Sequence, residues 1–220
     1  MNSAFDLKLG ASIEKTGIVA VLVVDDAKDA VPLARALLAG GVNAIELTLR
    51  TPAALDALRE IKSGVPEVLA GVGTVLSVGQ VSQVVEAGAA FGVAPGLNPR
   101  VLAAAREAGL SFAPGILTPS DIEQALEHGC KLLKFFPSEA SGGLSYLKSI
   151  AAPYAHLGLR FIPLGGLNAK NMASYLAEPS IAALGGSWLA PRELIQAGDW
   201  EAITALSAEA VRIIKSTRQP

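Results

Sequence analysis

The stretch IELTLRTP (residues 45–52) contains the two patterns that decide the fold. Its polar residues, Glu46, Thr48 and Arg50, alternate with aliphatic ones, as in a strand whose two faces meet different surroundings. Its last two residues are a threonine that can cap a helix and a proline that suits the first helical turn. The stretch therefore predicts a strand that passes directly into a helix.

The same alternation recurs along the chain. Short apolar runs begin near residues 18, 44, 68, 90, 111, 131, 160 and 181. Most intervals between them carry apolar residues at helical spacing. Two further pairs of a capping residue and a proline stand at Asn98-Pro99 and Thr118-Pro119. Glycines that can end a helix precede several runs, at Gly40, Gly88, Gly109, Gly129 and Gly158.

Eight strands that alternate with helices favour an α/β protein with the architecture of a (β/α)8 TIM barrel. We expect a single domain over residues 1–220, with an extra N-terminal helix at residues 3–15 and a long last helix from about Trp200 to Lys215. An open, doubly wound sheet is the alternative. In a barrel the reactive groups gather at the carboxyl ends of the strands, so they are expected there.

Composition restricts the classes of function. The net charge of −2 does not suggest a nucleic-acid-binding surface. The longest aliphatic run, IVAVLVV, is far shorter than the roughly 20 residues of a membrane helix. The start of the chain lacks the apolar stretch of a secretory signal, and the single cysteine, Cys130, excludes an internal disulfide. These features favour a cytoplasmic protein.

The stretch LLKFFP (residues 132–137) places a lysine among large apolar residues. Because strand side chains alternate, Leu132, Lys134 and Phe136 share the face expected inside the barrel, and the two residues between them face the helices. Burial disfavours an ammonium, and a neutral amine can attack a ketone to form a Schiff base. The lysine could instead reach solvent or pair with a buried carboxylate. Lys131 has the opposite parity and is expected to face away from the barrel axis.

Two charged residues of the second strand, Glu46 and Arg50, are predicted to share the inner face with Lys134. A carboxylate there can move protons, and a guanidinium can bind a substrate carboxylate through two hydrogen bonds. The alternative is an internal Glu46–Arg50 ion pair that holds the barrel closed. Thr74 adds a hydroxyl at the end of the third strand, although a threonine there could simply cap the next helix.

Glycine pairs follow the last two strands, in PLGGLN (residues 163–168) and LGGSWL (residues 184–189). Backbone N–H groups in such turns, followed by a helix N-terminus, can bind phosphate, and phosphate often binds at these loops in barrels. The candidates are Gly165, Gly166, Gly186 and Ser187.

The fourth and fifth strands end in APGLNP and APGILTP, where Pro95 and Pro114 shape the rim and no acid or base is present. His128 and His156 stand beside glycines expected to end helices, away from the reactive face. Because no Asp, Glu or His residues have the spacing of metal ligands, we expect neither a metal nor another cofactor.

Five motifs occur in the order ELTLRT, GTVL, PGL, KFFP and GGSWL, and together they resemble the family of 2-keto-3-deoxy-6-phosphogluconate (KDPG) and 4-hydroxy-2-oxoglutarate (KHG) aldolases. The resemblance covers nearly the whole chain. It implies a metal-independent class I lyase of the Entner–Doudoroff pathway that forms pyruvate and D-glyceraldehyde 3-phosphate. Family members are typically homotrimers.

The resemblance also implies roles for individual residues. Lys134 matches the Schiff-base lysine and Glu46 the general acid and base, while Arg50 and Thr74 match groups that bind the pyruvyl carboxylate. The glycine loops match the phosphate site, and Pro95 and Phe136 match residues that line the pyruvyl pocket.

One departure from the family pattern leaves the substrate open. Leu164 stands where the gluconate-type enzymes commonly carry threonine, and galactonate-specific relatives have an aliphatic residue there. A 2-dehydro-3-deoxy-6-phosphogalactonate aldolase is therefore an alternative. A phosphosugar isomerase or synthase that works without an imine, and a non-catalytic sensor of phosphorylated metabolites, are the other two.

Overall fold

The computed structural model describes residues 4–218, which form parallel strands that alternate with helices. The strands are β1 (Ile18–Leu22), β2 (Ala44–Thr48), β3 (Leu69–Gly73), β4 (Gly92–Val93), β5 (Phe112–Ala113), β6 (Gly115–Ile116), β7 (Leu132–Phe135), β8 (Arg160–Pro163) and β9 (Leu184–Gly186). The α-helices are α1 (Leu7–Thr16), α2 (Ala30–Ala39), α3 (Ala54–Gly64), α4 (Val78–Glu86), α5 (Pro99–Glu107), α6 (Pro119–Glu127), α7 (Gly143–Ala151), α8 (Met172–Leu176), α9 (Arg192–Ala197) and α10 (Trp200–Arg218). Short 3-10 helices are η1 (Ala27–Asp29), η2 (Glu139–Ser141) and η3 (Ala152–Leu157).

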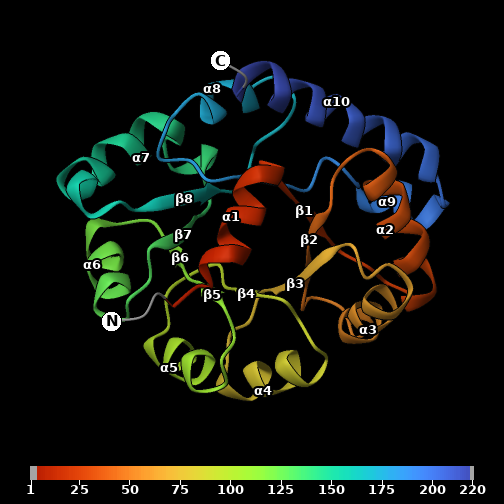
Figure 1. The fold of residues 1–220 in the computed structure, drawn as a ribbon, viewed down its shortest axis with the longest axis horizontal. Coiled ribbons are helices and arrows are strands. Elements are labelled where there is room, and N and C mark those ends of the chain that lie inside the picture. The colour runs from red at the N-terminus through yellow and green to blue at the C-terminus, as the bar shows by residue number, and fades with distance from the viewer. Residues whose placement is uncertain (1–3, 219–220) are drawn as a thin grey trace.

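The strands form a curled parallel sheet with helices on its outer side (Figure 1). One part has the order β5-β4-β3-β2-β1-β9 and the other has the order β6-β7-β8. Isolated bridges from Phe161 to Ile181 and from Leu164 to Gly185 link β8 to the segment around β9. The carboxyl ends of strands from both parts therefore face the same side.

Each predicted apolar run contains a strand, but the fifth run contains two. Pro114 separates β5, which pairs with β4, from β6, which pairs with β7. Proline has no N–H to donate to a neighbouring strand, so it interrupts the ladder at the point where the chain passes from one partner to the other.

Side-chain alternation divides the apolar residues into two clusters, as predicted. Ile45, Leu47, Leu133 and Phe135 pack between the sheet and the outer helices. Leu132 and other inward-facing residues form a second cluster inside the curl, and Phe5 and Ile13 from the region of α1 join it. The inner face is therefore apolar except where a strand presents a charged residue.

The predicted N-terminal helix is present as α1, although it begins later, at Leu7, and the start of the predicted range lies outside the described residues. Asp6 caps it by accepting a hydrogen bond from Leu9 N. A hydrogen bond from Phe112 N to Ala4 O and an ion pair between Arg160 and Glu14 attach this region to the amino ends of the strands. Figure 1 shows α1 lying across the middle of the curl.

Two of the three predicted cap–proline pairs are confirmed. Asn98 caps α5 and Thr118 caps α6, each with proline in the first turn. The prediction for Thr51 is wrong, because α3 begins at Ala54 and the Thr51 hydroxyl donates to Val24 O at 2.5 Å. The threonine joins two loops at the rim instead of starting a helix.

The prediction that a helix ends at Gly40 is confirmed, because Gly40 is the C-cap of α2, but its expected left-handed conformation is not found. The residue keeps a helical φ of −76°, and the left-handed turn falls at Gly41, with φ +89°. A Cβ on Gly40 would lie 2.7 Å from Thr204 O and would also strike Ser207, both in α10. Gly40 is thus required by close helix packing. The last helix, α10, extends three residues beyond its predicted end, to Arg218. Within residues 4–218, no helix is both long enough and apolar enough to cross a membrane.

Candidate active site

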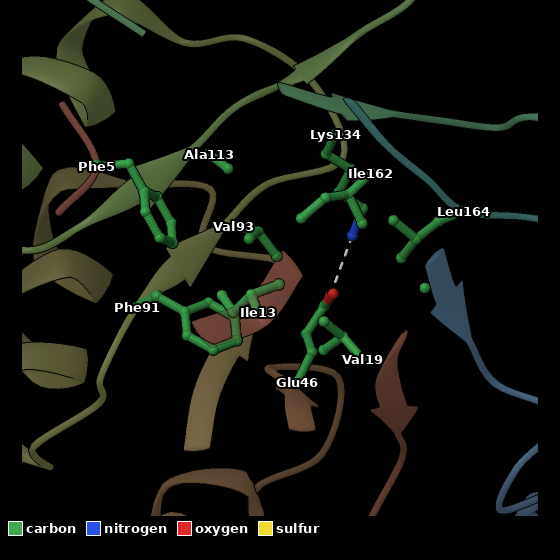
Figure 2. A pocket seen from close by; sticks show the side chains of 11 residues that line it. Phe5, Ile13, Val19, Glu46, Phe91, Val93, Ala113, Lys134, Ile162 and Leu164 are labelled. Atoms are coloured by element: carbon green, nitrogen blue, oxygen red, sulfur yellow. Dashed lines mark hydrogen bonds and ion pairs between the residues drawn. The ribbon is translucent and has the colours of Figure 1, made fainter. Parts of the chain in front are cut away.

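Lys134 lies in β7 with its side chain inside the curl and only 8% exposed. Its Nζ lies 3.0 Å from Glu46 Oε1 and 5.6 Å from the centroid of the Phe136 ring. Figure 2 shows the Lys134 nitrogen and a Glu46 oxygen facing each other across the interior, with Val19, Ile162 and other apolar side chains around them. Lys131, by contrast, is exposed, in agreement with its predicted orientation.

Glu46 reaches Lys134 because β3 leaves room beside it. Gly71 and Gly73 pair in register with Glu46 and Thr48, so neither places a side chain on the inner face. A Cβ on Gly73 would collide with the Glu46 carboxylate. The predicted alternative, a Glu46–Arg50 ion pair, does not form among the described residues, and the Glu46 carboxylate pairs with Lys134 instead.

A cavity of about 420 Å³ opens at the carboxyl ends of the strands above this pair. It brings together residues from both halves of the chain. Its lining consists of Val21, Glu46, Thr48, Arg50, Thr74, Pro95, Lys134, Phe136, Leu164, Gly165, Gly185 and Ser187. Nine of these are predicted site residues; Val21, Thr48 and Gly185 were missed. The parity of Thr48 with Glu46 is the signal that would have identified it.

Arg50 is a cation without an ion-pair partner in the part of the chain that the structure describes. Its Nε donates to Thr48 Oγ1 at 3.3 Å, and the Thr48 hydroxyl donates to Leu22 O at 2.9 Å. This chain of hydrogen bonds directs the guanidinium along the rim of the cavity. An unpaired guanidinium at the mouth of a pocket can bind a carboxylate in two-point fashion.

Thr74 lines the same cavity in an unusual conformation. Its φ is +63°, and it is the only non-glycine residue with a positive φ within residues 4–218. A β-branched residue is strained in the left-handed region, at a cost of about 1–3 kcal/mol. The helix that follows is capped by Ser77 and not by Thr74, so the alternative role of Thr74 as a cap is wrong.

The four residues of the glycine loops do not all reach the cavity. Gly165 and Ser187 line it, whereas Gly166 is exposed and outside the lining, and Gly186 ends β9 with Trp188 against it. Gly165 and Gly166 both have positive φ values, of +97° and +80°. A helix follows each loop after a short irregular segment, since α8 begins at Met172 and α9 at Arg192. Any anion bound here would meet loop N–H groups.

The remaining predicted residues lie at the rim or far from it. Pro95 lines the cavity and Pro114 does not. His128 ends α6 and His156 lies in η3, both outside the cavity lining. Within the described residues, no three His, Cys, Asp or Glu side chains come together in a group that could hold a metal ion.

The geometry defines what the cavity can do. It contains an amine and a carboxylate at its base, and a guanidinium and a glycine turn farther along its lining. An amine can attack a carbonyl carbon, and a carboxylate at 3.0 Å can carry protons to and from the adduct.

Three comparisons with known proteins agree with this geometry. The sequence model of the family "KDPG and KHG aldolase" matches residues 9–206. The KHG/KDPG aldolase of Escherichia coli strain K12 is 47% identical over 201 residues, which are 91% of this chain and 93% of that protein. A 2-dehydro-3-deoxy-phosphogluconate aldolase of Treponema pallidum is 43% identical over 92% of this chain and 96% of its own.

Solved structures are similar as well. The KDPG aldolase of Legionella pneumophila, captured with pyruvate as a covalent carbinolamine, has a TM-score of 0.87 and 38% identity over 92% of this chain and 97% of its own. Together with the buried lysine, these similarities define an aldolase, a lyase that breaks a carbon–carbon bond. The chain belongs to the KDPG and KHG aldolase family.

Proposed function

We propose that this chain is a class I aldolase that cleaves 2-dehydro-3-deoxy-6-phosphogluconate to pyruvate and D-glyceraldehyde 3-phosphate. The same site would cleave 4-hydroxy-2-oxoglutarate to pyruvate and glyoxylate. The observation that carries the proposal is the buried Lys134 Nζ, 3.0 Å from the Glu46 carboxylate at the base of an open cavity. The names of two relatives refer to these substrates: one is a KHG/KDPG aldolase and the other a 2-dehydro-3-deoxy-phosphogluconate aldolase.

The reaction follows from these two groups. The Lys134 amine attacks carbon 2 of the substrate, and water leaves to give a protonated imine. Glu46 takes the proton of the carbon 4 hydroxyl, and the bond between carbons 3 and 4 breaks. Its electron pair moves into the imine as an enamine, and the aldehyde leaves. Protonation of carbon 3 and addition of water then release pyruvate and restore the free amine.

The two ends of the substrate would be held on opposite sides of the cavity. Arg50 and Thr74 would bind the carboxylate, and the loops with Gly165, Gly166, Gly186 and Ser187 would bind the phosphate. Pro95, Phe136 and Leu164 would line the space between. Fixing both ends places the scissile bond at Lys134 and Glu46, which lowers the entropic part of the barrier.

We further propose that the two parts of the sheet close into one (β/α)8 barrel, with β5 and β6 as successive pieces of one strand, and that residues 1–220 form a single domain. The bridge between Leu164 and Gly185 supports closure. A continuous outer cluster from Ile18 to Ile214 supports one domain. We also propose that the chain forms a homotrimer, as the family resemblance implies. We propose a cytoplasmic location, because the buried, unpaired Cys130 suits a reducing environment.

Leu164 carries the second candidate, cleavage of the galactonate epimer. Its side chain is buried against Gly185 and cannot donate a hydrogen bond to a carbon 4 hydroxyl. A structure described as native KDPGal is 26% identical to this chain, with a TM-score of 0.82. Comparing kcat/KM for the two epimers decides between the candidates.

Trapping with borohydride tests the proposed function. Pyruvate and borohydride together should attach a stable adduct to Lys134, which peptide mass spectrometry locates, and chelators should leave cleavage unchanged. Without an adduct, but with turnover of phosphosugars, the chain would be an isomerase or synthase instead. Binding of phosphosugars without any turnover would indicate a sensor.

A further inference from the structure

Three polar side chains behind the Gly165–Gly166 turn have no part in the chemistry above. They are Ser138, Glu139 and Tyr175. Ser138 Oγ lies 2.9 Å from Tyr175 Oη, and the Tyr175 hydroxyl donates to Glu139 Oε1. Ser138 is 0% exposed and Tyr175 is 2% exposed. Buried hydroxyl groups are costly unless they are hydrogen-bonded, so this network fixes the arrangement of its members.

The network lies where the ends of two strands are joined. Ser138 N donates to Leu164 O at 2.7 Å, and Glu139 N donates to Gly165 O at 3.0 Å. These bonds connect the segment after β7, the strand of Lys134, to the turn after β8. Tyr175 comes from α8, the helix that follows the same turn. The Tyr175 hydroxyl therefore links the segment that follows the lysine strand to the helix that follows the glycine turn.

The network also controls a negative charge. The methylene groups of Glu139 lie against Gly166, since a Cβ on Gly166 would be 2.6 Å from Glu139 Cβ and 2.8 Å from Cγ. A carboxylate this close to the turn would repel a bound phosphate if it turned toward it. Desolvation, followed by the hydrogen bond to Glu139, raises the pKa of Tyr175 to about 12. The hydroxyl is therefore protonated at neutral pH and can donate to the carboxylate.

We infer that Tyr175 is a positioning residue for the phosphate end of the substrate. Its hydroxyl holds the Glu139 carboxylate behind the turn, so that the loop presents N–H groups to the phosphate without a competing negative charge. This inference rests on the proposed function and adds a determinant of preference between phosphorylated and unphosphorylated substrates.

The variant Tyr175→Phe tests it with two substrates that differ in phosphate. We expect KM for 2-dehydro-3-deoxy-6-phosphogluconate to rise about tenfold, as for the loss of a hydrogen bond to a charged group, with kcat nearly unchanged. KM for 4-hydroxy-2-oxoglutarate, which has no phosphate, should stay within about twofold. Inorganic phosphate should inhibit cleavage of 4-hydroxy-2-oxoglutarate by the wild type more strongly than cleavage by the variant.

Removing the charge should rescue the variant. The double variant Tyr175→Phe/Glu139→Gln should recover most of the affinity for the phosphorylated substrate. Glu139→Asp should raise the same KM in the wild-type background, because the shorter side chain cannot reach the hydroxyl. It changes an exposed residue, so it tests the inference even if Tyr175→Phe does not fold. Tyr154→Phe is the matched control, since its hydroxyl also donates to a glutamate, Glu123, at 2.8 Å.

An equal rise in KM for both substrates would show that Tyr175 has a purely structural role and would overturn the inference. The absence of rescue by Glu139→Gln would also overturn it. A wild-type protein that cleaves neither substrate and forms no borohydride adduct would instead overturn the proposed function. The two failures are therefore distinguishable in one set of assays.

Discussion

Two ion pairs of this protein have opposite surroundings. Lys134 Nζ and Glu46 Oε1 are 3.0 Å apart, with side chains 8% and 4% exposed. At the rim, Arg192 binds Asp25 through two hydrogen bonds, at 2.6 and 2.8 Å, and both residues face solvent. Only the interior pair lines the cavity.

The difference shows that distance alone does not decide what an ion pair does. Water screens the rim pair, and such pairs contribute little to stability. The interior pair is largely shielded from water, so each partner depends on the other, and a ligand that engages either one would affect both. Burial in the cavity therefore suits Lys134–Glu46 to the proposed chemistry, whereas Arg192–Asp25 is a surface contact.

The largest effect should come from Lys134→Ala. Without the amine no imine can form, and we expect cleavage to fall by on the order of 10⁴-fold or more. Lys134→Arg keeps the charge beside Glu46 but cannot form the imine, so it separates chemistry from packing. Activity in Lys134→Arg near that of the wild type would break the comparison, because the pair would then act only through its charge.

Glu46→Gln should have the next largest effect. The amide cannot accept the carbon 4 proton, so kcat should fall about 10²–10⁴-fold. Single-turnover trapping with pyruvate and borohydride should still label Lys134. The control is Asp25→Asn, which breaks the rim pair by the same chemical change and should leave kcat within about twofold. A similar loss in both variants would show that burial does not distinguish the pairs.

Arg50 is an intermediate case, a cation at the mouth with no partner among the described residues. Arg50→Lys keeps the charge but cannot bind a carboxylate through two parallel hydrogen bonds. The KM for 2-dehydro-3-deoxy-6-phosphogluconate should therefore rise about 10–100-fold, the equivalent of one or two charge-assisted hydrogen bonds. Steady-state kinetics and the concentration of pyruvate needed for half-maximal trapping both report this change. Unchanged values would mean that a group other than Arg50 binds the substrate carboxylate.

The smallest effect concerns the rim pair and pH. Hydrogen bonds from Arg192 and then Gln196 lower the pKa of Asp25 from 3.8 to about 2. A carboxyl with a lowered pKa in the folded state adds stability that is complete above the ordinary value and disappears as the pH falls toward the lowered one. The melting temperature of the wild type should therefore slightly exceed that of Asp25→Asn at about pH 6, and the difference should vanish near pH 2. A difference that grows in acid would contradict this assignment.

Much of the fold and site could be predicted, because alternation along a strand is a strictly local property. Lys134 shares its strand face with Leu132, and Glu46 shares its face with Thr48. This alternation indicates which side chains point inward without reference to the neighbouring strands. The eight apolar runs predicted the strands for the same reason. Asn98 and Thr118 were predictable because their caps involve residues only two or three positions away.

The errors arose where a distant contact overrode the local signal. Thr51 bonds to Val24 instead of capping a helix, and Gly40 is required by the approach of α10, which lies far along the chain. The partner of Glu46 was uncertain for the same reason: Arg50 was near in sequence, whereas Lys134 is 88 residues away. The Tyr175 network had no sequence signal, since its members join through the packing of α8.

The position of α1 has a consequence for the order of events in catalysis. Phe5 and Ile13 fill the interior beneath Lys134 and Glu46, so the cavity opens away from them, toward the carboxyl ends of the strands. A substrate bound to Lys134 in the proposed way would have its pyruvyl part deepest and its aldehyde part outermost. In the proposed reaction the aldehyde would therefore leave first and pyruvate second, and in the reverse condensation the keto acid would enter before its acceptor.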